Sequence, residues 1–338
     1  MLELARIGRQ IAVLRKEKGL TGEKLAEIVG VSPQAVSKWE NGKCLPESAL
    51  LPELANALGI SIDTLLMPNS NTNKHEPNEK VESFYEKVNE DSRLEQRSIE
   101  FDRSKNIISR YLNDKYMEIA DIGGGTGPYS FWLAGKGHNA HLLDLTPKHI
   151  NQAKKKAKEA NIELASYTCG DARALPYKDE SMDIVLIMGA LYHLQSYESR
   201  MKCLAEGYQV LKKGGHIICT VINRYNIFAA SIIWNLFLND LGTLEQAIKT
   251  GMADCFTLPQ AYSHTPREIL AELSNAGFET PMVLAVEGIA SAFGDYTWPT
   301  DEKESARLKK CIELSESIPE LIGVSRNVMA VGRKSPVL

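Results

Sequence analysis

The sequence lacks a long apolar run, closely spaced cysteines and an excess of charge of one sign. Its most apolar stretch, residues 227–238, has twelve residues, well short of the ~20 that a membrane-spanning helix needs. The six cysteines are scattered without a C-x-x-C pair, so we expect reduced packing residues and no metal site. Lys and Arg number 39 against 43 Asp and Glu, so no overall positive field attracts nucleic acid or a membrane. Any DNA binding must be local.

The chain is long enough for two domains. Its 338 residues are 43% hydrophobic and 24% charged, which is ordinary for globular proteins. The first ten residues mix acid and base and lack the apolar core of a secretion signal, so we expect a cytoplasmic protein. Residues 67–80 are rich in Asn and Pro and are typical of a linker. We therefore predict one domain over 1–66 and another over 81–338.

Short apolar-periodic segments before the linker predict an all-α domain of four or five helices. Thr21 can cap one helix, Gly30 can end it, and Ser32 with Pro33 can start the next after a tight turn. The second helix of this pair would bury Val36 and Trp39. Its other face, formed by Gln34, Ser37 and Lys38, suits a DNA major groove, although an ordinary solvated helix face has the same pattern.

The run TGEKLAEIVGVSPQAVSKWENGKCLPESALLPELANALGISIDTLL resembles the lambda-repressor/Cro-like helix-turn-helix family. The resemblance implies that Gln34, Ser37 and Lys38 enter the groove and that Lys43 approaches phosphates. Family members often have Gln where this chain has Gly22. Residues 1–66 hold eight basic and eight acidic side chains, so tight binding to double-stranded DNA would require a homodimer. A retained fold used only for protein contacts is the alternative.

After the linker, strand-like runs alternate with helical patterns, which predicts a doubly wound α/β sheet. The run from Asp121 to Gly127, D-I-G-G-G-T-G, is a strand end followed by a glycine-rich turn. A dinucleotide fingerprint, G-x-G-x-x-G, would need glycine where Pro128 stands. Asp121 would also repel a pyrophosphate, whereas it suits a ligand that carries an ammonium group.

Two further acids follow successive strands. Asp144 ends the second strand, where a carboxylate can accept both ribose hydroxyls. Asp171 follows the third strand, where it can accept the adenine amino group. Because ligands of doubly wound sheets bind at the carboxyl ends of the strands, the three acids favour S-adenosylmethionine.

The stretches DIGGGTGPY, HLLDLTP, GDARALPY, DIVLIMGALYHL and LKKGGHIICTVINR resemble class I S-adenosylmethionine-dependent methyltransferases of the bacterial small-molecule type. The resemblance implies a seven-stranded sheet whose last two strands are antiparallel. It also implies the cofactor contacts: Asp121, Gly123, Gly125 and Gly127 at the methionine end, Asp144 at the ribose, Asp171 and Ala172 at the adenine, and Met188 and Gly189 beneath the methyl group.

Methyl transfer needs alignment of the acceptor and, for a hydroxyl or protonated amine, a base. His193 beside Tyr192, and His264, are the candidate catalytic residues. Each histidine can instead be structural, bracing a loop or preceding a helix. Tyr85, Arg93 and Arg97 lie on a segment that forms a lid in the resembling family, although a solvated helix is the alternative.

Aromatic residues between the fifth and sixth strands suggest an apolar or aromatic small-molecule acceptor, although core packing explains them equally well. They are Tyr225, Phe228, Trp234, Phe237, Phe256 and Tyr262, and we expect residues 227–238 to form a helix closing over the site. The run MGALYHL contains neither motif of the DNA-base methyltransferases. The leading hypothesis is a small-molecule methyltransferase coupled to transcription. The alternatives are a regulator whose methyltransferase fold only senses a ligand, and a macromolecule-modifying methyltransferase.

Overall fold

The computed structural model describes residues 7–8, 11–12, 14–15, 18, 20–47, 50–58, 65, 85, 98–234, 241–255, 258–293, 299 and 301–336. The chain divides by its internal contacts into two compact units, Met1–His75 and Glu76–Leu338. The predicted linker 67–80 and the residues Arg93 and Arg97 lie outside the described residues.

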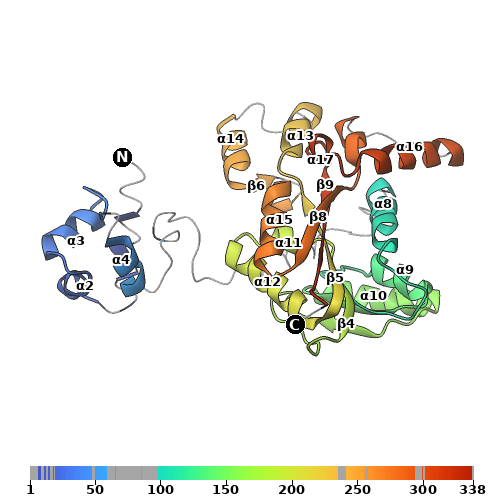
Figure 1. Cartoon of the computed structure of the whole chain (residues 1–338), viewed down its shortest axis with the longest axis horizontal. Helices are drawn as coiled ribbons and strands as arrows, with labels where there is room; N and C mark the ends of the chain where they lie inside the picture. The colour runs from blue at the N-terminus through green and yellow to red at the C-terminus, as the bar shows by residue number, and fades with distance from the viewer. Residues whose placement is uncertain are drawn as a thin grey trace. The chain divides into compact units, whose positions relative to one another are not determined.

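The first unit contains helices α2 (Gly22–Val29), α3 (Pro33–Glu40) and α4 (Leu51–Leu58) (Figure 1). The predicted helix boundaries are confirmed. The Thr21 hydroxyl accepts a hydrogen bond from the Lys24 N–H, Gly30 ends α2 with a φ of 72°, and Ser32 caps α3. Each cap satisfies backbone groups that a helix end leaves unpaired. The apolar faces of the helices meet in one core, which includes Ile11, Leu25, Val36, Trp39, Leu54 and Leu58.

The second unit is built on a seven-stranded sheet in the order β3-β2-β1-β4-β5-β9-β8. The strands are β1 (Glu118–Ile122), β2 (Asn139–Asp144), β3 (Ser166–Cys169), β4 (Met182–Ile187), β5 (Leu211–Ile222), β8 (Glu279–Ala285) and β9 (Asn327–Arg333). The first five are parallel, and β9 pairs antiparallel with both β5 and β8. The predicted fold class and the antiparallel last pair are confirmed.

Helices cover both faces of this sheet. On one face α8 (Ser98–Ser109), α9 (Pro128–Gly135) and α10 (Pro147–Ala160) pack against Ile119, Ile184 and Ile218. On the other face α12 (Tyr197–Val210) and α15 (Pro266–Asn275) pack against Ala120, Val185 and Ile217. Neighbouring residues of one strand therefore enter different cores, as expected of a parallel sheet buried on both sides. Figure 1 shows the two sets of helices on opposite sides of the strands.

The remaining elements lie in the connections that follow β4, β5 and β8. They are α11 (Ala190–His193), α13 (Asn226–Trp234), α14 (Leu241–Thr250), β6 (Met252–Cys255), β7 (Leu258–Tyr262), the 3-10 helix η2 (Gly288–Phe293), α16 (Glu302–Ser315) and α17 (Pro319–Ile322). Strands β6 and β7 form a separate antiparallel pair that the sequence pattern did not predict. Within the described ranges, no helix combines the length and the apolar character that crossing a membrane requires.

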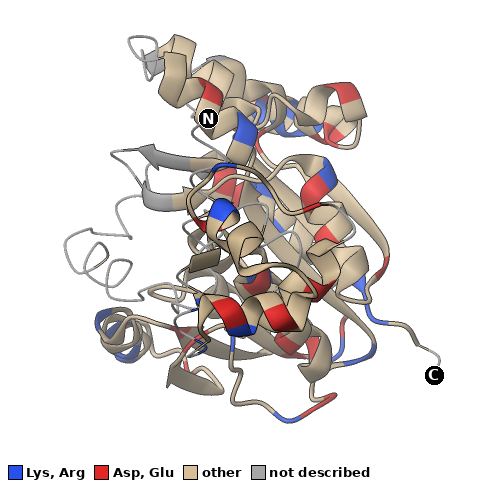
Figure 2. Ribbon diagram, turned by 90° about the vertical axis from the view of Figure 1, so that its left-hand side faces the viewer, with Lys and Arg blue, Asp and Glu red and all other residues tan. Residues whose placement is uncertain are grey.

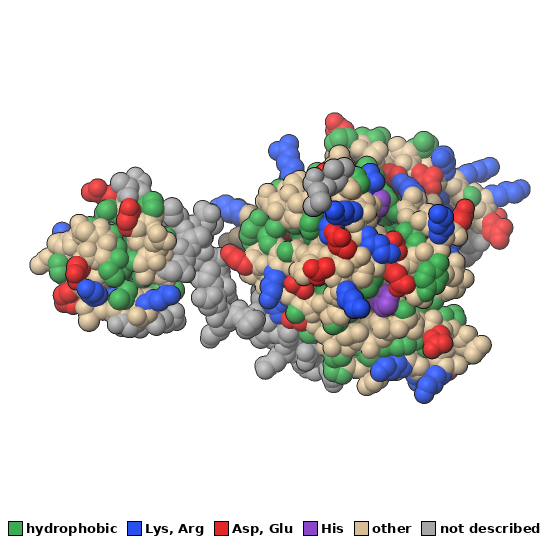
Figure 3. All heavy atoms as spheres, turned by 60° about the horizontal axis from the view of Figure 1, so that its bottom comes forward, with side chains coloured by type: hydrophobic (Ala, Val, Ile, Leu, Met, Phe, Trp, Pro, Cys, Tyr) green, Lys and Arg blue, Asp and Glu red, His purple; other side chains and the backbone are tan. Residues whose placement is uncertain are grey.

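The surface carries charges of both signs. Figure 2 shows acidic and basic positions interspersed along the helices, and Figure 3 shows both signs side by side on the face that it draws. The expectation that the cysteines are packing residues holds for Cys203 and Cys219. It is wrong for Cys44, Cys169 and Cys311, which are exposed.

Candidate functional site

A cavity lies where β1, β2, β3 and β4 end. Its empty volume is about 1100 Å³, including space open to solvent. The residues that follow these four strands line it together with residues of α11 and with Tyr85. Of the predicted site residues, it brings together Gly123, Gly125, Asp144, Asp171, Ala172, Met188, Gly189, Tyr192 and His193. Asp121, Gly127 and His264 are not among its lining residues.

The glycine loop after β1 has no room for side chains. A Cβ atom on Gly123 would lie 2.9 Å from the Cβ of Ala190, and one on Gly124 would lie 2.6 Å from Oδ2 of Asp121. Gly123 also has a φ of 68°, which favours glycine. Gly127 does not line the cavity but caps α9, with Pro128 at the first helical position. The loop therefore forms a backbone wall between β1 and α11.

Asp144 is the buried carboxylate of the cavity wall. Its Oδ2 accepts a 2.8 Å hydrogen bond from the Gly125 N–H. Its Oδ1 accepts from the Thr146 N–H at 2.8 Å and from Nδ1 of His149 at 3.1 Å. His149 was not among the predicted site residues, although its position five residues after Asp144, in the first turn of α10, is a usable signal. These contacts fix the Asp144 carboxylate beside the glycine loop.

Asp121 lies behind the loop. Its side chain is fully buried, and its Oδ2 accepts from the Ser130 hydroxyl at 2.7 Å. Its Oδ1 has no hydrogen-bond partner among the described residues. Burial raises the pKa of Asp121 to about 6, and the charge of Asp144 acts in the same direction. Asp121 thus lies beneath the glycine loop and holds Ser130 near the start of α9. It does not line the cavity, so its effect on a ligand there would be electrostatic.

Asp171 is paired with Arg173, which was not among the predicted site residues. The Arg173 guanidinium donates to both carboxylate oxygens, with Nη2 2.6 Å from Oδ2. The D-x-R spacing in GDARALPY was the available signal. A guanidinium in this two-pronged geometry holds the carboxylate plane. Ala172 next to it adds apolar surface to the same wall.

Tyr85 and His193 form a hydrogen-bonded pair in the cavity. The Tyr85 hydroxyl lies 2.8 Å from Nε2 of His193. The Tyr85 ring also makes edge contacts with His193 and His149, with centroid distances of 5.4 and 5.3 Å. Tyr192 packs against His193 at 4.5 Å, and a Cβ atom on Gly189 would lie 2.9 Å from the Tyr192 hydroxyl. Segments far apart in the sequence thus place two groups able to exchange a proton side by side.

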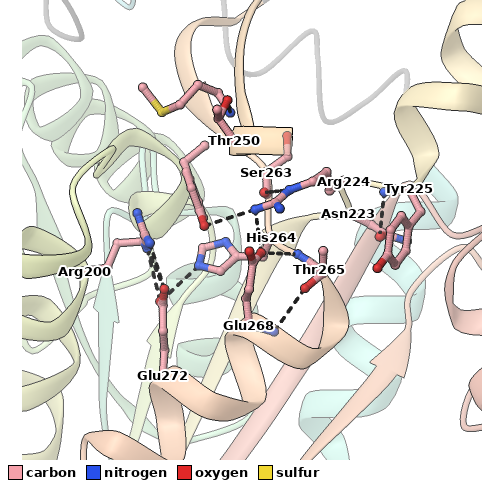
Figure 4. Close-up of polar contacts among 12 residues, drawn as sticks. Arg200, Asn223, Arg224, Tyr225, Thr250, Ser263, His264, Thr265, Glu268 and Glu272 are labelled. Atoms are coloured by element: carbon pink, nitrogen blue, oxygen red, sulfur yellow. Dashed lines mark hydrogen bonds and ion pairs between the residues drawn. The ribbon is translucent and has the colours of Figure 1, made fainter. Parts of the chain in front are cut away.

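His264 belongs to a buried charged network instead (Figure 4). It is fully buried, and its Nε2 lies 3.1 Å from Oε2 of Glu272. Burial lowers the pKa of His264, although Glu272 opposes this shift. Glu272 is also buried; hydrogen bonds from His264 and Arg200 outweigh its desolvation and lower its pKa. This placement corrects the expectation that His264 is a catalytic base, because no cavity-lining surface belongs to it.

The same network holds the loop that carries His193. Nη1 of Arg200 donates to the carbonyl oxygens of Leu194 and Gln195 at 3.1 and 2.7 Å. Its Nη2 donates to Oε1 of Glu272 at 2.8 Å, and its guanidinium lies 3.6 Å from the Tyr262 ring centroid. Leu194 and Gln195 both line the cavity. Arg200, missed from the sequence, therefore connects the buried network to the cavity wall.

The aromatic segment after β5 does not line this cavity. Residues 226–234 form α13, which covers the described part of the helix expected over 227–238, and none of residues 226–233 belongs to the cavity wall. Tyr225 and Phe228 are exposed, and Tyr262 belongs to the Arg200 network. Phe237, Phe256 and the side chain of Trp234 lie outside the described residues. The expectation that residues 227–238 close over the site is therefore not met by residues 227–233, and residues 235–238 lie outside the described residues.

A second candidate site is the outer face of α3 in the first unit. Gln34, Ser37 and Lys38 are exposed on this helix, and Lys43, which follows it, is exposed as well. Val36 and Trp39 are buried on the opposite face. The predicted division of α3 into a core face and an exposed polar face is confirmed.

Comparison with known proteins agrees with this arrangement. Residues 120–219 match the family described as "Methyltransferase domain", and residues 11–65 match the family described as "Helix-turn-helix". The ubiquinone/menaquinone biosynthesis C-methyltransferase of Ruegeria sp. (strain TM1040) is 29% identical over 170 residues, which are 48% of this chain and 66% of that protein. The demethylmenaquinone methyltransferase of Listeria welshimeri is 28% identical over 175 residues, 47% of this chain and 69% of that protein.

The chain thus spans about two thirds of the length of these curated relatives. A solved structure of an S-adenosylmethionine-dependent methyltransferase from Methanosarcina mazei is 19% identical, with a TM-score of 0.47, and covers 68% of this chain and 97% of its own. The two family matches thus assign a methyltransferase domain to residues 120–219 and a helix-turn-helix domain to residues 11–65.

Proposed function

We propose that the second unit transfers a methyl group from S-adenosylmethionine to a small neutral acceptor, and that the helix-turn-helix domain binds double-stranded DNA as a homodimer. The observation that carries the enzymatic part is the Tyr85–His193 pair, which lies in the same cavity as the glycine loop and Asp144.

The cavity residues fit the cofactor. We assign Gly123 and Gly125, which both line the cavity, to the methionine end, because their lack of side chains allows close approach to the backbone. The buried charge of Asp121 and the cap made by Gly127 support that end from behind. Asp144 would hold the ribose, Asp171 and Ala172 the adenine, and Met188 and Gly189 the end that carries the methyl group.

The protein supplies alignment, exclusion of water and proton transfer. When bound, S-adenosylmethionine supplies an electrophilic methyl group on a positively charged sulfur. An acceptor held beside Tyr85 passes its proton to the Tyr85 oxygen while Tyr85 donates its own proton to Nε2 of His193. The bound cofactor would supply the methyl carbon for the new bond to the acceptor, and its sulfur would retain the electrons of the broken C–S bond. Such acid–base assistance typically contributes about 10²–10⁴-fold.

The cavity lining supports a neutral acceptor. Apart from its histidines, the only ionisable side chains charged at neutral pH among the described lining residues are Asp144 and Asp171. Both are already assigned to the cofactor. Tyr85, Tyr192, Leu194 and Gln195 provide an aromatic and amide surface beside His193. The relatives named for ubiquinone and menaquinone biosynthesis favour an aromatic or otherwise apolar acceptor.

The test is methyl transfer from isotopically labelled S-adenosylmethionine into a metabolite extract, read by mass spectrometry. We expect one labelled product, with turnover about 100-fold lower in His193→Asn and about tenfold lower in Tyr85→Phe. Tyr116→Phe, which changes a tyrosine that is 61% exposed, is the matched control and should keep wild-type turnover. Cofactor binding without any product would instead favour a ligand-sensing regulator.

A further inference from the structure

The Asp144 carboxylate has little hydrogen-bonding capacity left for a ligand. A carboxylate offers about four acceptor sites on its two oxygens. Gly125, Thr146 and His149 already donate to three of them, two at Oδ1 and one at Oδ2. One site therefore remains, on Oδ2. If Asp144 accepted hydrogen bonds from both ribose hydroxyls, it would need two free acceptor sites, whereas this geometry leaves one.

His149 holds an unused acceptor next to that carboxylate. Its side chain is 3% exposed and lines the cavity. Because Asp144 can only accept, Nδ1 of His149 must carry the proton of their 3.1 Å hydrogen bond. In the neutral ring Nε2 is then an acceptor, and it is buried without a hydrogen-bond partner among the residues described. A buried polar atom of this kind is costly unless a ligand or water satisfies it.

We propose that His149 is a second ribose-binding residue, so that one ribose hydroxyl donates to Oδ2 of Asp144 and the other donates to Nε2 of His149. The inference rests on the proposed use of S-adenosylmethionine. It assigns two roles to one ring, because Nδ1 orients the Asp144 carboxylate while Nε2 receives the ligand.

The Tyr85 ring links this ribose site to the proposed acceptor site. It makes edge contacts with His149 and His193, and its hydroxyl bonds to His193. The backbone carbonyl of Tyr85 accepts from Nζ of Lys148, the residue before His149. A cofactor ribose bound by His149 would therefore lie near the Tyr85 ring, which also borders the proposed acceptor site.

The experiment is calorimetric titration of the full chain with S-adenosylhomocysteine and its 2′-deoxy and 3′-deoxy analogues. His149→Asn keeps an amide donor near the position of Nδ1 and removes Nε2, whereas His149→Gln places an amide near the position of Nε2. His138→Asn makes the same change at a buried histidine outside the cavity lining and is the matched control.

We expect the wild type and His138→Asn to lose about three- to tenfold in affinity for each deoxy analogue. In His149→Asn the affinity for S-adenosylhomocysteine should fall by a similar factor, and removal of one of the two hydroxyls should then have no further effect. His149→Gln should recover part of the difference in affinity between S-adenosylhomocysteine and the corresponding deoxy analogue. If His149→Asn fails to fold, the loss of discrimination in His149→Gln relative to wild type decides the question.

Two results would overturn the inference. If His149→Asn and His149→Gln discriminate against both analogues as the wild type does, the second hydroxyl binds elsewhere and His149 only positions Asp144. If the wild type does not bind S-adenosylhomocysteine at all, the proposed function fails first, and the two failures are thereby distinguished.

Discussion

Asp121 and Asp144 are both buried acids at the ends of neighbouring strands, but the fold gives them different partners. Three donors surround Asp144, whereas Asp121 lies beneath a glycine loop with one unpaired oxygen. The desolvation that raises the pKa of Asp121 to about 6 is offset only partly by Ser130. The protein therefore holds a poorly stabilised carboxylate directly under its ligand cavity.

This environment predicts a pH-dependent stability cost. Between the ordinary pKa of 3.8 and the folded-state value of about 6, the folded state keeps a proton that the unfolded state releases. The free energy of unfolding therefore falls as pH rises through this window. Asp121→Asn removes the titration. We expect the free energy of unfolding of the variant, relative to wild type, to rise by about 2 kcal/mol between pH 4.5 and 7.5. Urea denaturation at both pH values measures it, and a constant difference would contradict the assignment.

Single residues were predictable where the backbone alone decides their position. The D-x-G-x-G-x-G spacing and the acids after successive strands placed Gly123, Gly125, Asp144 and Asp171 correctly around one cavity, because parallel strands end at one edge of a sheet. Spacing could not separate His193 from His264. Each follows a strand, and only tertiary contacts decide which one faces a cavity and which one faces Glu272.

At the level of elements, the loop between β1 and α9 depends on the absence of side chains. Gly124→Ala would place a methyl group 2.5 Å from Cδ1 of Leu142 and 2.6 Å from Oδ2 of Asp121. We expect a loss of about 1–3 kcal/mol of unfolding free energy from overpacking, together with much weaker binding of S-adenosylhomocysteine. Gly135→Ala is the control, because nothing lies within 4 Å of its added Cβ. Thermal denaturation and calorimetry check both, and equal effects would contradict this packing.

Arg200 connects Glu272 on α15 to the loop that carries His193. Removing the charge of Glu272 should therefore lower the free energy of unfolding strongly. Arg200 and Glu272 have side chains only 4% and 5% exposed. Glu272→Ala leaves the Arg200 guanidinium buried without its carboxylate, so we expect a loss of about 3–5 kcal/mol. The exposed pair Lys155–Glu159 provides the comparison, and Glu159→Ala should cost less than about 1 kcal/mol. Urea unfolding measures both, and similar losses would refute the role of the network.

Hydrophobic patterning predicted the elements of the sheet well, because apolar runs bounded by turn residues mark buried strands. It did not predict the β6–β7 pair or the position of α13. Apolar composition predicts that residues 226–234 form a helix but does not say which surface that helix contacts. The exposed Phe228 and Ile232 on α13 show the difference.

For the whole molecule, the near-neutral first unit predicts DNA binding that depends on a few groups. Gln34→Ala removes a potential two-pronged base contact and should cost about 1–3 kcal/mol per half-site. Lys38→Ala should weaken binding to all DNA sequences to a similar extent. It should also lower the slope of log affinity against log salt concentration by about one unit. Lys24→Ala is the control, since this exposed lysine on α2 pairs with Glu27. Fluorescence anisotropy on an operator selected from random sequences, at several salt concentrations, measures all three. If Lys24→Ala matches Lys38→Ala, α3 is not the recognition helix.

The position of Tyr85 affects how the catalytic half should be isolated. A fragment designed from secondary structure would begin at α8, with Ser98. That cut would discard Tyr85, which lines the cavity and whose hydroxyl contacts His193, while it would keep the sheet and its two apolar cores. We expect such a fragment to fold and to bind S-adenosylmethionine but to show no methyl transfer. The missing activity would then be mistaken for evidence that the full protein is not catalytic.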